Sequence, residues 1–130
     1  MREEHHLPPE SVADTLESTL RIHRPARQTL PVVVASPHSG RDYPPDFVAR
    51  SPLSMPRLRS SEDSFVDEIF ATAPECGAPL LQALFPRVFV DVNREPFELD
   101  PGMFDAPLPA YVTTRNARIA AGLGTIARVV

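Results

Sequence analysis

The chain has 130 residues, enough for one small domain, and 42% of them are hydrophobic, as in an ordinary globular protein. The formal net charge is −4, and all 13 basic residues are arginines scattered along the chain, which argues against a nucleic-acid-binding face. No run of about 18 apolar residues occurs, so we expect no membrane span, and the single cysteine, Cys76, favours a reducing, cytoplasmic setting.

The N-terminal region allows two interpretations. Residues 19–24 alternate apolar and polar side chains, which is typical of an edge strand. Apolar residues spaced by four also fit a helix over residues 10–20. In either case we expect residues 1–27 to form an N-terminal extension and edge element.

A buried strand followed by a polar turn comes next. Residues 31–35 contain three consecutive valines and predict a core strand, which ends at Ser36-Pro37-His38-Ser39-Gly40. Because ligands of open α/β sheets bind beyond the carboxyl ends of strands, His38 is placed where a metal ligand or an acid–base group is useful.

A proline-rich segment and a helix follow. Four prolines between residues 41 and 60 exclude a long helix. They predict a surface loop that contains at most one short helical turn. Ser60 and Asp63 resemble a capping box, and an apolar stripe predicts a helix from there to Pro74.

The second half predicts three further strands. Residues 79–84 and 87–92 are β-prone, and the second stretch is apolar on both faces, which indicates a central strand. Residues 97–118 predict an extended loop, and residues 125–130 another strand. We therefore expect an α/β fold in which residues 28–130 are the N-terminal part of a larger domain.

Three polar groups are candidates for chemistry. If the two core strands are parallel neighbours, His38 and the Asp91-Val-Asn93-Arg94 turn emerge at the same edge of the sheet. Zinc prefers imidazole and carboxylate ligands, so His38 with Asp63 or Glu62 would supply two of them. Asp67, four residues after Asp63, would share its helical face, so that one acid could bind the metal while the other orients a partner.

Simpler interpretations remain open for each of these residues. Acidic residues are favoured at a helix N-terminus by the macrodipole alone. Arg94 suits bidentate binding of a carboxylate, but it could equally pair with Asp91, Glu95 or Glu98. Ser39 lacks the G-x-S-x-G setting of a serine hydrolase.

Taken together, the motifs resemble the N-formylglutamate amidohydrolase family, and the resemblance extends from about residue 28 to the end. The matching segments are VASPHSG (34–40), SEDSFVD (61–67), GAPLL (77–81), FVDVNRE (89–95), ELDPGMF (98–104) and AGLGTIA (121–127).

The resemblance implies a mixed, mainly parallel sheet flanked by helices, similar to zinc carboxypeptidases. It implies metal-dependent hydrolysis of the formyl amide of N-formyl-L-glutamate, or of a similar small N-acyl amino acid, as in one route of histidine degradation. A divalent metal, expected to be zinc, would polarise the formyl oxygen and activate water. The expected roles are metal ligands His38 and Asp63, catalytic residues Asp67 and Asp91, and substrate-binding residues Ser39, Asn93 and Arg94.

Two departures from the family pattern shape these expectations. Arg41 stands three residues after His38, so the H-x-x-E pair of zinc carboxypeptidases is absent and the second ligand must come from elsewhere. Family members are about twice this long, and no histidine follows His38 to serve as third ligand. The alternatives are an inactive truncated homologue that serves for binding or assembly, or a metal-free carboxylate-binding module. All of them place His38 and Arg94 in one cleft.

Overall fold

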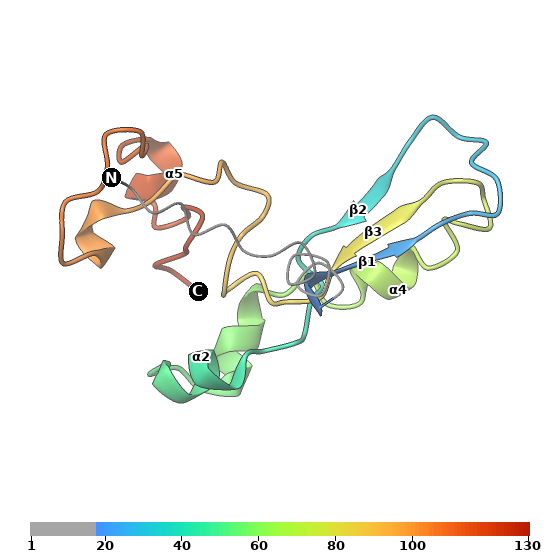
Figure 1. The fold of residues 1–130 in the computed structure, drawn as a ribbon. Coiled ribbons are helices and arrows are strands. Elements are labelled where there is room, and N and C mark those ends of the chain that lie inside the picture. Colours follow the sequence, from blue (N-terminus) through green and yellow to red (C-terminus); the bar gives the residue numbers. More distant parts are fainter. Residues whose placement is uncertain (1–17) are drawn as a thin grey trace, which may run out of the picture.

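The computed structural model describes residues 18–130 and has a small three-stranded sheet at one end of the molecule (Figure 1). The strands are β1 (Leu20–His23), β2 (Val34–Ser36) and β3 (Leu80–Ala83), in the order β1-β3-β2. β3 pairs parallel with β2 and antiparallel with β1. The expected α/β class with a mixed sheet is confirmed, but the pairings of the described residues are evenly divided and not mainly parallel.

The edge-strand prediction for residues 19–24 is confirmed, since β1 lies at the sheet edge. Most of the alternative helix over residues 10–20 lies outside the described residues. So does most of the proposed extension over residues 1–27, and this boundary stays a prediction.

The helical segments of residues 18–130 are short, and none of them is long and apolar enough to cross a membrane. The prolines between residues 41 and 60 exclude a long helix, as predicted. However, two short helices form there instead of the single helical turn expected, and each has a proline in its first turn. The segments are α2 (Pro45–Arg50), α3 (Met55–Leu58), η1 (Arg59–Ser61), α4 (Val66–Ile69), η2 (Pro101–Met103) and α5 (Ala117–Ala120).

The helix expected from Ser60 to Pro74 is wrong over most of its length. The Ser60 hydroxyl donates to the Arg57 carbonyl and caps no helix, and Phe65 has a left-handed backbone with φ 67°. Helix α4 begins only at Val66. Asp63 therefore lies in a loop and shares no helical face with Asp67.

The strands expected at 87–92 and 125–130 are also wrong. A turn forms around Val88, where the Phe89 N–H donates to the carbonyl of the buried Pro86 at 3.0 Å. Near the C-terminus, the Gly122 carbonyl accepts from Arg128 and Val129, so the chain curls back on itself. β3 takes the central position in their place, and the Asp91 turn reaches the site from a loop.

Residues 97–118 are largely irregular, as predicted. They contain η2, the first residues of α5, and one isolated bridge between Glu98 and Thr113. In Figure 1 this C-terminal region lies at the opposite end of the molecule from the sheet, and α2 projects between the two.

The interior combines apolar and polar side chains. Leu58 and Leu80 are among the most buried apolar residues, whereas several large apolar side chains, such as Val33 and Ile69, are exposed. The buried polar set is Ser36, His38, Ser39, Asp67, Asp91, Glu98 and Thr125. Buried polar groups must be paired, and this requirement organises the site described next.

Candidate functional site

The turn after β2 is fixed by a close approach to the segment after β3. A Cβ atom on Gly40 would lie 2.0 Å from the Phe85 carbonyl oxygen and 2.5 Å from that of Leu84, so only glycine fits. The Asp42 N–H donates to the Leu84 carbonyl at 2.9 Å. These contacts hold the Pro-His-Ser-Gly turn against the body of the protein.

The same turn positions Asp63 through its backbone. The Asp63 N–H donates to the His38 carbonyl at 3.0 Å, and the Ser39 hydroxyl donates to the Asp63 carbonyl at 3.0 Å. The Asp63 side chain is half exposed, and one of its oxygens faces the imidazole. The loops that carry the two candidate metal ligands, His38 and Asp63, are thus joined although they are 25 residues apart in sequence.

The imidazole of His38 lies between two carboxylates. Its Nδ1 atom is 3.1 Å from Asp63 Oδ2, and its Nε2 atom is 2.8 Å from Asp91 Oδ1. His38 and Asp91 are both buried. The structure therefore brings together three of the predicted site residues.

Asp91 faces polar partners with both of its carboxylate oxygens. Oδ1 accepts from His38 and from the Asn93 N–H at 2.9 Å, and Oδ2 accepts from Arg87 Nε at 3.1 Å. Arg94 Nη2 lies 3.6 Å from Oδ2. Burial opposes ionisation of Asp91, but the hydrogen bonds from His38 and the Asn93 N–H, together with the charge of Arg87, outweigh it, so the pKa of Asp91 is lowered.

Arg94 is tied to the protein by all its guanidinium nitrogens. Nε donates to the Leu123 carbonyl at 3.1 Å and Nη1 to the Asn93 carbonyl at 2.9 Å, while Nη2 faces Asp91. His38 and Arg94 thus meet on opposite oxygens of the same carboxylate. That they open into one cleft stays a prediction, as do the substrate-binding roles of Asn93 and Arg94.

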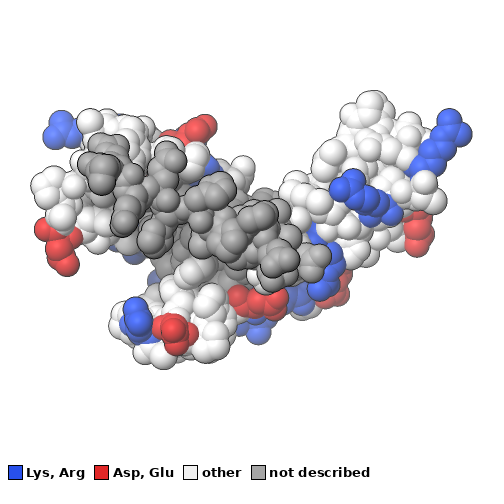
Figure 2. Space-filling model, in the orientation of Figure 1, with Lys and Arg blue, Asp and Glu red and all other residues white. Residues whose placement is uncertain are grey.

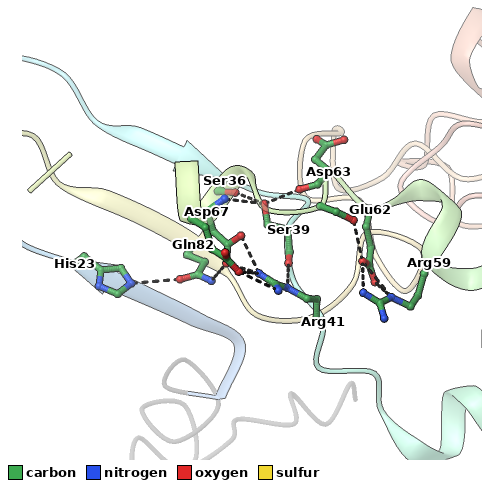
Figure 3. Close-up of polar contacts among 11 residues, drawn as sticks. His23, Ser36, Ser39, Arg41, Arg59, Glu62, Asp63, Asp67 and Gln82 are labelled. Carbon is green, nitrogen blue, oxygen red and sulfur yellow. Dashed lines mark hydrogen bonds and ion pairs between the residues drawn. The ribbon is translucent and has the colours of Figure 1, made fainter. Parts of the chain in front are cut away.

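Ser39 and Asp67 belong to a second network of polar side chains, which is drawn in Figure 3. The Ser39 hydroxyl bonds to the Ser36 hydroxyl and accepts from the Asp67 N–H at 3.3 Å. The Asp67 carboxylate accepts from Arg41 at 2.9 Å and from Gln82 at 2.7 Å. These contacts favour positioning roles, and the roles of Ser39 in substrate binding and Asp67 in catalysis stay predictions.

Glu62, the alternative ligand, has its own partners. Its side chain accepts from the Tyr43 hydroxyl at 2.7 Å and from Arg59 Nε at 3.1 Å. Burial and the bond to Glu62 raise the pKa of Tyr43. Because this pairing occupies Glu62, Asp63 is the better candidate ligand of the two.

Sequence reasoning missed Arg87 and the cavity beside it. A cavity of about 230 Å³ is lined by Arg87, Asp91 and apolar side chains that include Val88, Leu123 and Val129. The sequence does contain a signal for the Arg87–Asp91 ion pair, because Arg87 stands four residues before Asp91. The wrong assignment of residues 87–92 to a strand hid this signal, since residues four apart do not meet in a strand. The approach of residues 123–130 to this point could not be read from local pattern.

Charges of both signs are interspersed on the face shown in Figure 2. That distribution resembles an ordinary solvated surface. The absence of a nucleic-acid partner stays a prediction.

Comparisons with known proteins place the chain in a family. The N-formylglutamate amidohydrolase family model matches residues 30–130. A solved N-formylglutamate amidohydrolase from Ralstonia eutropha JMP134 is 36% identical, with a TM-score of 0.75 over 84% of this chain. The chain spans 38% of that protein's length. No curated protein matches the chain. The matched region contains every predicted site residue, and the chain belongs to the N-formylglutamate amidohydrolase family.

Proposed function

We propose that this chain takes part in metal-dependent hydrolysis of the formyl amide of N-formyl-L-glutamate, in which water cleaves the C–N bond to give formate and glutamate. The family and the solved relative support the reaction class. Because the chain spans 38% of that relative, the complete reaction belongs to the proposal. We place it in the cytoplasm on the grounds of its single cysteine.

The observation that carries the proposal is the His38 imidazole between Asp63 and Asp91. Histidine ligands of metals commonly donate the remaining ring N–H to a carboxylate, which fixes the tautomer. Asp91, 2.8 Å from Nε2, is placed to accept that N–H. The Nδ1 lone pair then faces Asp63, whose nearest oxygen is 3.1 Å away.

The donor types fit a divalent metal, and zinc in particular. A neutral imidazole and an acidic side chain are ordinary zinc ligands, and two ligand atoms of one tetrahedral zinc are separated by roughly 3.3 Å. Within residues 18–130, no group of three histidine, cysteine or acidic side chains gathers around one point. His38 and Asp63 would therefore supply two donors, and a third would come from outside the described residues.

A bound metal would supply Lewis acidity, which polarises the formyl oxygen and lowers the pKa of the attacking water. The residues of this chain do the remaining work. Asp91 stays ionised and keeps the proton of His38 on Nε2. The Ser39 hydroxyl donates to the Asp63 carbonyl and so holds the Asp63 backbone against the Pro-His-Ser-Gly turn. Asn93 and Arg94 are proposed to orient the substrate, and Asp67 to support the turn through Ser39.

The test combines metal analysis with a formate-release assay on the purified chain. Stoichiometric zinc together with formate release from N-formyl-L-glutamate supports the proposal. An inactive homologue that only binds or assembles is the second candidate, because only two donors gather in the described part of the chain. The absence of both metal and formate, in a chain shown by circular dichroism to be folded, would favour that candidate.

A further inference from the structure

The cavity beside Asp91 has one guanidinium with unused donors. Arg87 lines the cavity and donates to Asp91 through Nε alone. Among the described residues, its two terminal nitrogens have no partner. Arg94 is not among the cavity-lining residues, and its three nitrogens face Leu123, Asn93 and Asp91.

The exposure of the two side chains agrees with this difference. The Arg87 side chain is 27% exposed and that of Arg94 is 15% exposed. Arg87 can therefore accept a new partner without breaking a bond to the protein, whereas Arg94 would have to exchange existing ones. A guanidinium with two free terminal nitrogens has the fork geometry that binds a carboxylate.

The local charge also favours an anion. Two guanidiniums, Arg87 and Arg94, face the single carboxylate of Asp91, and both oxygens of that carboxylate accept hydrogen bonds. Asp91 supplies one negative charge to this pair, and the charge of Glu98 also acts on Arg94. Apart from Arg87 and Asp91, the lining has no charged side chain, and its larger apolar members are Val88, Leu123, Val129 and Val130. Such walls suit methylene groups and reduce screening of the cation by water.

We propose that Arg87, and not Arg94, presents the guanidinium that binds the side-chain carboxylate of the substrate, with the methylenes of that side chain against the apolar wall. This inference rests on the proposed function for its choice of substrate. It assigns specificity for an acidic amino acid over its neutral amide to a residue outside the Asp91-Val-Asn93-Arg94 motif.

Equilibrium binding of L-glutamate and L-glutamine by calorimetry tests the inference without requiring turnover. We expect the unaltered chain to bind glutamate about 10- to 100-fold more tightly than glutamine, the range for one charge-assisted bidentate contact. In Arg87→Gln this preference should fall to within about twofold. In the exposed control Arg57→Gln it should persist.

The ratio separates binding from a merely structural role. If Arg87 only held Asp91, its loss would weaken glutamate and glutamine binding equally. An unchanged ratio in Arg87→Gln would overturn the proposal, and so would an unaltered chain that prefers neither ligand. A glutamate preference that depends on Arg87, in a folded chain that binds no metal and releases no formate, would refute the proposed function and leave this inference intact.

A second variant covers the case in which Arg87→Gln does not fold. Ser61 lines the same cavity, so Ser61→Asp places a competing carboxylate there and leaves the Arg87–Asp91 pair in place. We expect Ser61→Asp to lower the glutamate preference about fivefold or more relative to Ser61→Asn, since like charges repel in a poorly screened site. Equal preferences in the two variants would refute a carboxylate-binding cavity.

Discussion

Replacing Asp91 with asparagine should destabilise the protein in a manner that depends on pH. The amide keeps the shape of the side chain but removes the charge that faces His38, Arg87 and Arg94. Asp91 is 3% exposed, so it is desolvated, and each lost charge-assisted bond costs about 1.5–3 kcal/mol. The contacts with the two arginines count for less, since Arg87 is partly exposed and Arg94 lies 3.6 Å from the carboxylate, beyond hydrogen-bond distance.

From these contacts we expect the free energy of unfolding to fall by about 3 kcal/mol at pH 7. The folded-state pKa of Asp91 is lowered, whereas an unfolded aspartate titrates near pH 3.9. The stabilisation is therefore complete above about pH 4 and is lost as the pH falls through the folded-state pKa. The difference between Asp91→Asn and the unaltered protein should shrink accordingly in acid.

Urea unfolding followed by circular dichroism at several pH values measures this difference. The exposed Asp105 provides a matched control, since Asp105→Asn makes the same chemical change at a solvated position. Equal stability of Asp91→Asn and the unaltered protein at pH 7 would refute the central role of the carboxylate. A deficit that stayed constant from pH 7 to pH 3 would show that charge is not its cause.

Three further predictions concern the turn, the metal and the C-terminal region. Gly40→Ala should cost several kcal/mol or prevent folding, because its Cβ would collide with backbone carbonyls. Gly102→Ala is the control and should be tolerated, because its Cβ would meet only a side-chain oxygen at 3.3 Å. Thermal unfolding compares the stability of the two variants. His38→Ala should abolish zinc retention measured by elemental analysis, and His23→Ala should not; zinc retained at full stoichiometry in His38→Ala would remove His38 from the site. Glu98→Gln should lower the urea midpoint of unfolding, since the Glu98 carboxylate accepts from the side chains of Asn116 and Arg118, and an unchanged midpoint would contradict that role.

Short-range patterns predicted the part of the fold in which local and tertiary preferences agree. The alternation of residues 19–24 identified β1, because an edge strand keeps one face in solvent. The valines before residue 36 indicated β2, but the expected buried core strand over residues 31–35 is wrong. β2 begins only at Val34 and lies at a sheet edge, and Val32 and Val33 are exposed. Pro44 and Pro45 correctly excluded a long helix and instead begin a short one.

The errors arose where a tertiary contact outweighed a local pattern. The Ser60–Asp63 sequence has the residues of a capping box, but the Asp63 N–H bonds to the carbonyl of His38. The 87–92 segment is apolar enough for a strand, yet a turn follows the buried Pro86, and the Asp91 N–H bonds to the carbonyl of Thr125. Neither partner lies close in sequence, so no local rule identifies it.

The sequence identified which residues meet at the candidate site more accurately than it identified the elements that carry them. We expected His38 and Arg94 to converge because two parallel strands end at one sheet edge. They converge for another reason, which is that both contact Asp91, carried by a loop after the turn at Val88. Arg87 was missed because it is adjacent to this carboxylate only in the turn and not in the expected strand.

The convergence on one carboxylate links stability with chemistry at this site. Asp91 orients the proposed metal ligand His38, and it also holds Arg87 at the cavity. A change at Asp91 should therefore weaken zinc retention and glutamate preference together, along with stability. A change at Arg87 removes only one of the donors to Asp91, so it should reduce glutamate preference while zinc retention persists. Measuring both properties in Asp91→Asn and Arg87→Gln separates the two roles, and zinc loss in Arg87→Gln equal to that in Asp91→Asn would show that the cavity and the metal ligands are not independent.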